Sequence, residues 1–220
     1  MPTASAGPPA GAASVTFLSV GVDGPAADAS RERVFTFTTD AAGIVEASAE
    51  VGGPDSIRLC LGRGAPGSET AQQCQESSSE VTITSAASTA QTTWTVTLTG
   101  AEGAGGLVDL ALAFPSVQPS VTIDGFRFQG TAFDAYNGFL AEVRIGCCSL
   151  AMDAEWTGGS APYRLLLSAS DGGTIMDESG EGGGFAFDAQ TAADSYRIRL
   201  SNQQEFAEQD FTLRATISWF

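Results

Sequence analysis

The feature that most constrains the fold is an internal repeat: a pattern from the first half of the chain returns in the second half. The corresponding segments are 44–51 and 149–156, 57–61 and 163–167, 94–98 and 196–200, and 108–112 and 211–215. Glycines and a proline follow the first segment in both halves. The spacing between partners drifts by only a few residues, as small changes in loop length would produce. The repeat therefore predicts two similar domains in tandem.

Within each repeat, apolar and polar side chains alternate with a period of two residues. Val45, Ala47, Ala49 and Val51 alternate with Glu46, Ser48 and Glu50, and Trp94, Val96 and Leu98 alternate with Thr95 and Thr97. Strict alternation indicates strands with one buried face and one solvated face. Several such strands, separated by Gly-, Asp- and Ser-containing turns, are typical of a sandwich. We predict an all-β fold of two tandem antiparallel β-sandwich domains, jelly-roll-like and related by the internal repeat.

The repeat also predicts the domain boundaries. Residues 1–14 are rich in Pro, Ala and Gly and are expected to form a flexible linker. The first domain is expected over 15–117 and the second over 118–220. The segment 115–119 contains two prolines and would act as a short hinge that limits the relative orientations of the domains.

The charged residues exclude several classes of function. The chain has 26 acidic and 10 basic residues, contains neither histidine nor lysine, and has a formal net charge of −16. Such a charge repels nucleic-acid phosphates and anionic membrane surfaces. Without histidine or lysine, the chain cannot form a Ser-His-Asp triad, a histidine-ligated zinc site, a Schiff base or a P-loop. We therefore expect a protein that is not an enzyme and needs no cofactor.

Membrane insertion is not expected either. The longest apolar stretch, 107–114, is far shorter than the ~20 residues that span a bilayer. Residues 1–14 lack the basic and apolar regions of a signal peptide, and we expect a signal or upstream region to have been removed; a native cytosolic start is the alternative.

The four cysteines fall into two pairs. Cys60 ends an apolar run and Cys74 lies beyond a Gly/Pro/Ser loop, so a disulfide between them would close a loop at a strand. We predict this disulfide, a typical device of extracellular proteins. Cys147 and Cys148 are adjacent and would point to opposite faces of a strand. A strained bridge, a buried thiol, a reactive thiol and a cross-link to another cysteine all stay open for this pair.

The order of motifs resembles the pre-peptidase C-terminal (PPC) domain. The second half contains the segments 154–156, 163–167, 193–200 and 211–213 in the order of that family's strands, including its tryptophan-ended and aromatic strands. The first half matches with Val51 in place of the tryptophan and with Asp55 as the acid of the turn. The resemblance implies a jelly-roll-like, non-catalytic appendage of a secreted protein, associated with matrix binding and, in some members, with calcium.

Two segments are candidates for binding. Asp171, Asp177, Glu178 and Glu181 form an acidic segment, expected to be a loop, whose oxygens could hold calcium; a solvated loop without metal is the alternative. Phe133, Asp134, Tyr136 and Asn137 form the least core-like part of an aromatic-rich segment and are a candidate binding loop; packing in the core is the alternative.

These observations lead to two functional hypotheses. The first is a non-catalytic extracellular or cell-surface module that binds a polysaccharide or an extracellular protein, or acts as a spacer. The second is a structural subunit of an extracellular or virion assembly, in which residues Val15 to Val20 could add as a strand to a neighbour's sheet. Self-association distinguishes the second hypothesis from the first.

Overall fold

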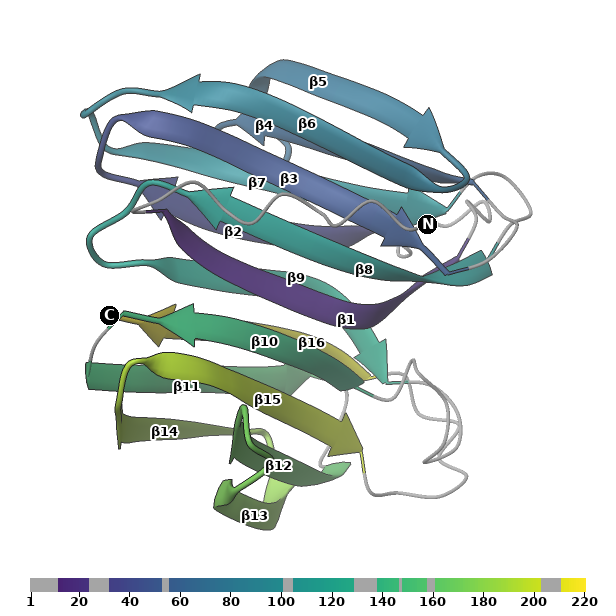
Figure 1. Ribbon diagram of the computed structural model, residues 1–220. Coiled ribbons are helices and arrows are strands. Elements are labelled where there is room, and N and C mark those ends of the chain that lie inside the picture. Colours follow the sequence, from purple (N-terminus) through teal and green to yellow (C-terminus); the bar gives the residue numbers. More distant parts are fainter. Residues whose placement is uncertain are drawn as a thin grey trace.

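The structure, a computed structural model, describes residues 12–23, 32–52, 56–100, 105–128, 138–146, 148–157, 161–202 and 211–220. Strands make up most of these residues and none of them is helical, so the all-β prediction is confirmed. Consequently no described segment is a helix that could cross a membrane. The strands form two antiparallel eight-stranded sheets, arranged as a β-sandwich (Figure 1).

Each half of the chain supplies eight strands. Those of the first half are β1 (Ala13–Asp23), β2 (Arg33–Thr39), β3 (Gly43–Val51), β4 (Ile57–Arg63), β5 (Thr70–Ser77), β6 (Glu80–Ala87), β7 (Thr92–Gly100) and β8 (Gly105–Phe114). Those of the second half are β9 (Ser120–Phe128), β10 (Gly138–Ile145), β11 (Cys148–Thr157), β12 (Ala161–Ala169), β13 (Thr174–Gly182), β14 (Gly184–Thr191), β15 (Asp194–Asn202) and β16 (Phe211–Trp219). Every segment that the alternation predicted as a strand lies within one of these elements.

The first half folds as a jelly roll. Its strands lie in the order β1-β8-β3-β6 in one sheet, called sheet A here, and β2-β7-β4-β5 in the other, called sheet B. Only the β4–β5 connection joins two strands of the same sheet, and every other connection in the first half crosses from one sheet to the other. This arrangement of eight strands in two sheets is the jelly-roll order.

The second half repeats this order with the sheets exchanged. Its strands lie as β9-β16-β11-β14 in sheet B and β10-β15-β12-β13 in sheet A. Adding eight to each strand number of the first half therefore gives the order of the second half. The repeat seen in the sequence is thus a repeat in topology, and the predicted pair of related jelly rolls is confirmed.

The two jelly rolls share both sheets. Strand β1 pairs with β10 in sheet A, and β2 pairs with β9 in sheet B. Because β9 and β10 are the repeats of β1 and β2, these two pairings are equivalent contacts, as in a twofold-symmetric dimer interface. Figure 1 shows sheet A running without interruption from β6 through β1 and β10 to β12.

The core extends across this junction. Phe37 on β2 stacks on Phe114 at the end of β8, with ring centroids 4.4 Å apart. Phe114 in turn meets the edge of Trp219 on β16 at 6.2 Å. All three side chains are at most 2% exposed. Aromatic burial therefore links the two halves in addition to the strand pairing.

Four strands at the outer ends of the sheets were not expected from the sequence: β5, β6, β13 and β14. The expectation of an acidic loop is wrong for most of its length. Asp171 lies in a turn, whereas Asp177, Glu178 and Glu181 lie on β13. This edge strand carries polar side chains on both faces, so it lacks the alternation that marks a half-buried strand. A charge on the inner face, such as Glu178 opposite buried Leu165, is one way in which an edge strand avoids unwanted pairing.

The suggestion that Val15 to Val20 serve as a free arm is also wrong. These residues belong to β1, which pairs with β8 on one side and β10 on the other. Val15, Phe17 and Val20 are buried in the core. The segment is a central strand of its own chain because its apolar face completes the sandwich.

Candidate functional site

The described residues include one polar pocket on the outer face of sheet B, where the β4–β5 hairpin folds back over the sheet. Its volume is about 280 Å³. It is lined by Glu32, Arg58, Cys60, Gly67, Glu69, Gln72, Thr97 and Thr99, and is called the hairpin pocket below. Among the described residues of this lining, none has an aliphatic or aromatic side chain.

The floor of the hairpin pocket comes from the outward-facing positions of two paired strands. On β4, Arg58 and Cys60 alternate with buried Ile57, Leu59 and Leu61. In the register, Thr99 of β7 lies opposite Arg58, and Thr97 lies opposite Cys60. The strand period that builds the core therefore also fixes these polar groups on one rigid surface.

The connection between β4 and β5 forms the wall of the pocket and is anchored to β7. The backbone N–H of Gly64 donates to the carbonyl of Thr93 at 2.9 Å, and the hydroxyl of Thr95 donates to the carbonyl of Gly64 at 2.8 Å. Gly64 has a φ of 119°, which a residue with a side chain rarely adopts. These two hydrogen bonds hold the loop over the outer face of sheet B.

The return strand contains a local distortion beside the pocket. Ala71 has a φ of 51°, and the register between β4 and β5 shifts between Leu61 and Arg63. A residue other than glycine in the left-handed region costs of the order of 1 kcal/mol, and such residues concentrate at functional sites. Bulges also redirect side chains, and this one precedes Gln72 of the pocket.

The predicted disulfide between Cys60 and Cys74 is confirmed. The two cysteines lie directly opposite one another on β4 and β5, with 14 residues of sequence separation. Cys60 is only 6% exposed and contributes to the pocket lining. The disulfide thus fixes the edge strand β5 to the pocket floor.

Arg58 is the positive group of the pocket. Within the described part of the chain its side chain forms no ion pair and no hydrogen bond, although Glu76 lies opposite it on β5. Its side chain is exposed, so the guanidinium presents its donors to solvent and to any ligand in the pocket.

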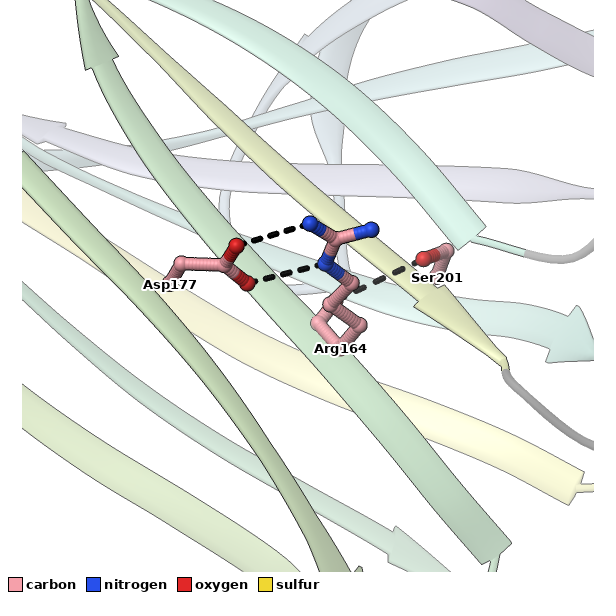
Figure 2. Close-up of polar contacts among 3 residues, drawn as sticks. All are labelled: Arg164, Asp177 and Ser201. Carbon is pink, nitrogen blue, oxygen red and sulfur yellow. Dashed lines mark hydrogen bonds and ion pairs between the residues drawn. The ribbon is translucent and has the colours of Figure 1, made fainter. Parts of the chain in front are cut away.

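The repeat provides a second arginine at the same position in the other half. Arg164 on β12 corresponds to Arg58, and it forms a bidentate ion pair with Asp177 on β13, with N–O distances of 2.8 and 2.7 Å (Figure 2). This hydrogen-bonded pairing lowers the pKa of Asp177 and raises that of Arg164. The hydroxyl of Ser201 donates to the carbonyl of Arg164 at 3.5 Å. Unlike Arg58, Arg164 already has an anionic partner.

The calcium candidates do not form a cluster. Asp177 and Glu181 lie opposite Leu166 and Pro162, on the outer face, whereas Glu178 lies opposite inward-facing Leu165. Strand alternation therefore separates Glu178 from its neighbours, Asp171 accepts a hydrogen bond from its own turn at Gly173, and Asp177 binds Arg164. Among the residues that the structure describes, no group of three or more acidic or cysteine side chains could hold a metal ion.

Two other predictions fall partly or wholly outside the described residues. Phe133, Asp134, Tyr136 and Asn137 all lie outside them, as does Cys147. Cys148 takes part in a disulfide and has a φ of 79°. No free cysteine occurs in the described part of the chain.

The pocket residues other than Cys60 were not identified from the sequence. One signal was available: Arg58 and Arg164 occupy the same position of the repeat on otherwise apolar strands. Another was the loop closed by the predicted disulfide, which had to lie near the β4 surface. The contribution of Glu32, Thr97 and Thr99 depends on the strand register, which the sequence did not provide.

Comparisons with known proteins identify only distant structural likeness. No protein family model and no curated protein matches the chain. Among solved structures, the PBSX exported protein XepA is 6% identical over 92% of this chain and 86% of its own, with a TM-score of 0.30. The stem and receptor-binding domain of spike protein P1 from bacteriophage PM2 is 9% identical over 84% of this chain and 96% of its own, with a TM-score of 0.23. Procruciferin, an 11S globulin from Brassica napus, is 9% identical over 92% of this chain and 75% of its own, with a TM-score of 0.22. Likeness at this level assigns neither a partner nor a chemistry to this chain.

Proposed function

We propose that this protein is a non-catalytic extracellular binding module and that the hairpin pocket is its binding site. The observation that carries the proposal is a concave, mainly polar surface on rigid strands, with an exposed arginine whose side chain has no partner in the described structure. Binding residues are commonly held by loops that a rigid scaffold positions. The β4–β5 hairpin on the jelly roll has this arrangement.

An extracellular location is supported by the disulfide. Cys60 and Cys74 form a bridge across two strands, and Cys148 takes part in a disulfide as well. Disulfides persist in oxidising compartments and are rare in the reducing cytosol. The similarity to PPC domains implies the same location and stays a prediction.

The lining of the pocket favours binding over catalysis. Hydrolysis by two carboxyl groups requires one of them to be kept protonated, usually by an apolar setting. Glu32 and Glu69 instead line an open polar pocket with Arg58. The chain has no histidine or lysine to supply another general base or nucleophile.

The proposal is tested by retention of the purified protein on a panel of insoluble glycans and extracellular matrix proteins. Two variants alter the pocket. Arg58→Ala removes its only cationic side chain among the described lining residues, and Thr97→Trp fills the pocket from an outward-facing position. The control is Arg214→Ala, which removes an exposed arginine from the same face of sheet B in the other half.

We expect retention on at least one polymer, lost in both pocket variants and kept in the control. Retention that survives both pocket variants would show that the hairpin pocket is not the binding site. Retention on no polymer, together with self-association in sedimentation velocity, would favour the structural-subunit hypothesis instead.

A further inference from the structure

We infer that the ligand of the hairpin pocket is a neutral glycan, with one sugar ring held between Glu32 and Arg58. This inference rests on the proposed binding function and names the chemical class of the ligand. It follows from the hydrogen-bonding groups of the lining, from its charge and from the strand spacing.

The lining alternates donors and acceptors. Arg58 supplies only donors, and the carboxylates of Glu32 and Glu69 supply only acceptors when ionised. Gln72, Thr97 and Thr99 can both donate and accept. A sugar hydroxyl also does both, so neighbouring hydroxyls on a ring need this mixture of partners.

The charge of the lining disfavours simple ions. Two carboxylates and one guanidinium give the pocket a negative balance, which repels an anionic ligand at short range. The guanidinium, in turn, disfavours a bare metal cation that Glu32 and Glu69 could otherwise share. A neutral ligand with many hydroxyls is bound without either penalty.

The described residues of this lining include no aliphatic or aromatic side chain, which disfavours a peptide or a lipid. Recognition of a peptide in a groove normally uses pockets for its side chains, and lipid chains require apolar surface. The volume of about 280 Å³ lies just below the range for small-molecule sites, ~300–1,000 Å³. A single ring of a longer glycan suits this volume, with the rest of the chain in solvent.

The register fixes the width of the site. Arg33 pairs with Leu98, so continuing this register places Glu32 beside Thr99, and Thr99 lies opposite Arg58. Glu32 and Arg58 are thus on strands separated by β7, about 9–10 Å apart at the spacing of a sheet. This width leaves room for a ring that accepts from Arg58 on one side and donates to Glu32 on the other.

Comparison with the second half supports the role of Arg58. Arg164 at the repeated position is held by Asp177, and the residue opposite Cys60 in the first half is a cysteine rather than an acid. The disulfide therefore secures the first hairpin without occupying its arginine. Arg58 keeps its donors for a ligand.

The experiment is saturation-transfer NMR of the full chain with separate small probes. The neutral probes are glucose, galactose, mannose and N-acetylglucosamine; the acidic probe is glucuronic acid, and the zwitterionic probe is alanine. Competition titrations then compare the wild type with Arg58→Ala, Glu69→Gln and the control Arg214→Ala. All of these positions are outside the core, and circular dichroism checks that each variant is folded.

We expect transfer to at least one neutral sugar, with affinity reduced about tenfold or more in Arg58→Ala and Glu69→Gln and unchanged in the control. Pocket-dependent binding of glucuronic acid or alanine alone would overturn the neutral-glycan inference. Binding of a neutral sugar that neither pocket variant weakens would overturn it as well.

The failure of this inference can be distinguished from failure of the binding function. If no sugar binds but a polymer of the retention panel is still held through the pocket, the ligand class is wrong and the binding function stands. If neither the sugars nor the panel bind through the pocket, both proposals fail.

Discussion

The β4–β5 and β12–β13 hairpins occupy equivalent places in the two jelly rolls but are fastened in different ways. In the first, Cys60 and Cys74 face each other across the strands and form a disulfide. In the second, the equivalent facing positions are Leu166 and Asp177, and Asp177 pairs with Arg164. A disulfide thus links the two strands of the first hairpin, and an exposed ion pair links those of the second.

The way in which each hairpin is linked determines which of its charged side chains remain available for other contacts. The ion pair uses both the acid and the arginine of the second hairpin, so neither is available to a ligand. The disulfide uses neither, and Arg58 stays exposed above the floor of a pocket. Differences at a few edge positions of the repeat therefore leave Arg58 without an anionic partner in the described structure, whereas Arg164 is paired with Asp177.

The largest loss of stability is expected from removing the disulfide between Cys60 and Cys74. The double variant Cys60→Ala/Cys74→Ala should lower stability by about 3 kcal/mol, because the unfolded chain is no longer constrained by the closed loop. For a chain of this size, this corresponds to a fall in Tm of roughly 6–12 °C in a thermal melt. Mutation is preferable to a reducing agent, which would also act on the disulfide of Cys148. An unchanged Tm would mean that the disulfide does not fasten this hairpin.

The next effect concerns packing of the second hairpin. In Gly180→Ala, the new Cβ would lie 2.8 Å from the hydroxyl of Tyr163, whose ring stacks on Phe185 at 4.8 Å. Displacement of this ring should cost about 1–3 kcal/mol in urea unfolding. Gly106→Ala is the matched control, because a Cβ there meets no atom within 4 Å. Equal effects of the two substitutions would contradict this account.

A smaller effect is expected at the distorted strand beside the pocket. Ala71→Gly should raise stability by up to about 1 kcal/mol, since glycine adopts the positive φ of this position without steric cost. Ala111→Gly, on a regular strand, should lower stability by about 0.5–1 kcal/mol in the same denaturation experiment. If Ala71→Gly destabilised the protein as much as this control, the left-handed conformation would be wrong.

The smallest effect is expected from the ion pair. Both partners are well exposed, so Asp177→Asn should change stability only slightly at neutral pH. Because pairing lowers the pKa of Asp177, its contribution is present above the ordinary value of 3.8 and is lost as the pH falls through the lowered pKa. Urea denaturation of the two proteins should therefore differ near neutral pH and converge in strong acid. A difference that grows on acidification would contradict the pairing.

The sequence predicted the central strands well because they obey the alternation rule. Val45, Ala47 and Ala49 are buried on β3 as their spacing required, and the repeat gave the relation between the two halves. Strand β5 was not predicted because it has no buried face to impose a period: Gln73 and Gln75 are exposed although they lie opposite buried Leu61 and Leu59. Strand β6 does bury Val81 and Ile83, and its short alternation was missed.

The candidate site was less predictable for a related reason. Cys60 and Cys74 could be paired from their spacing along the chain, but Glu32 and Thr99 meet Arg58 only through the pairing of three strands. The acidic residues near Asp177 were grouped by closeness in sequence, and strand alternation then placed them on different faces. Short-range sequence patterns cannot reveal contacts that depend on register.

The position of the terminal strands has a consequence for how the protein could be tethered. Ala13, at the start of β1, pairs with Phe114, and Phe114 contacts Trp219 at the end of β16, so both strands meet at one end of the sandwich. Strand β7 runs from Thr92, beside Thr39 near that end, to Gly100, which places Thr99 and Arg58 about 20 Å away along the strands. Tethers attached at Ala13 and at Phe220 would therefore leave the molecule on the same side. A pulling force between the two tethers would act on the Phe114–Trp219 contact. The opposite end of the sandwich, which carries Arg58, would face away from both tethers.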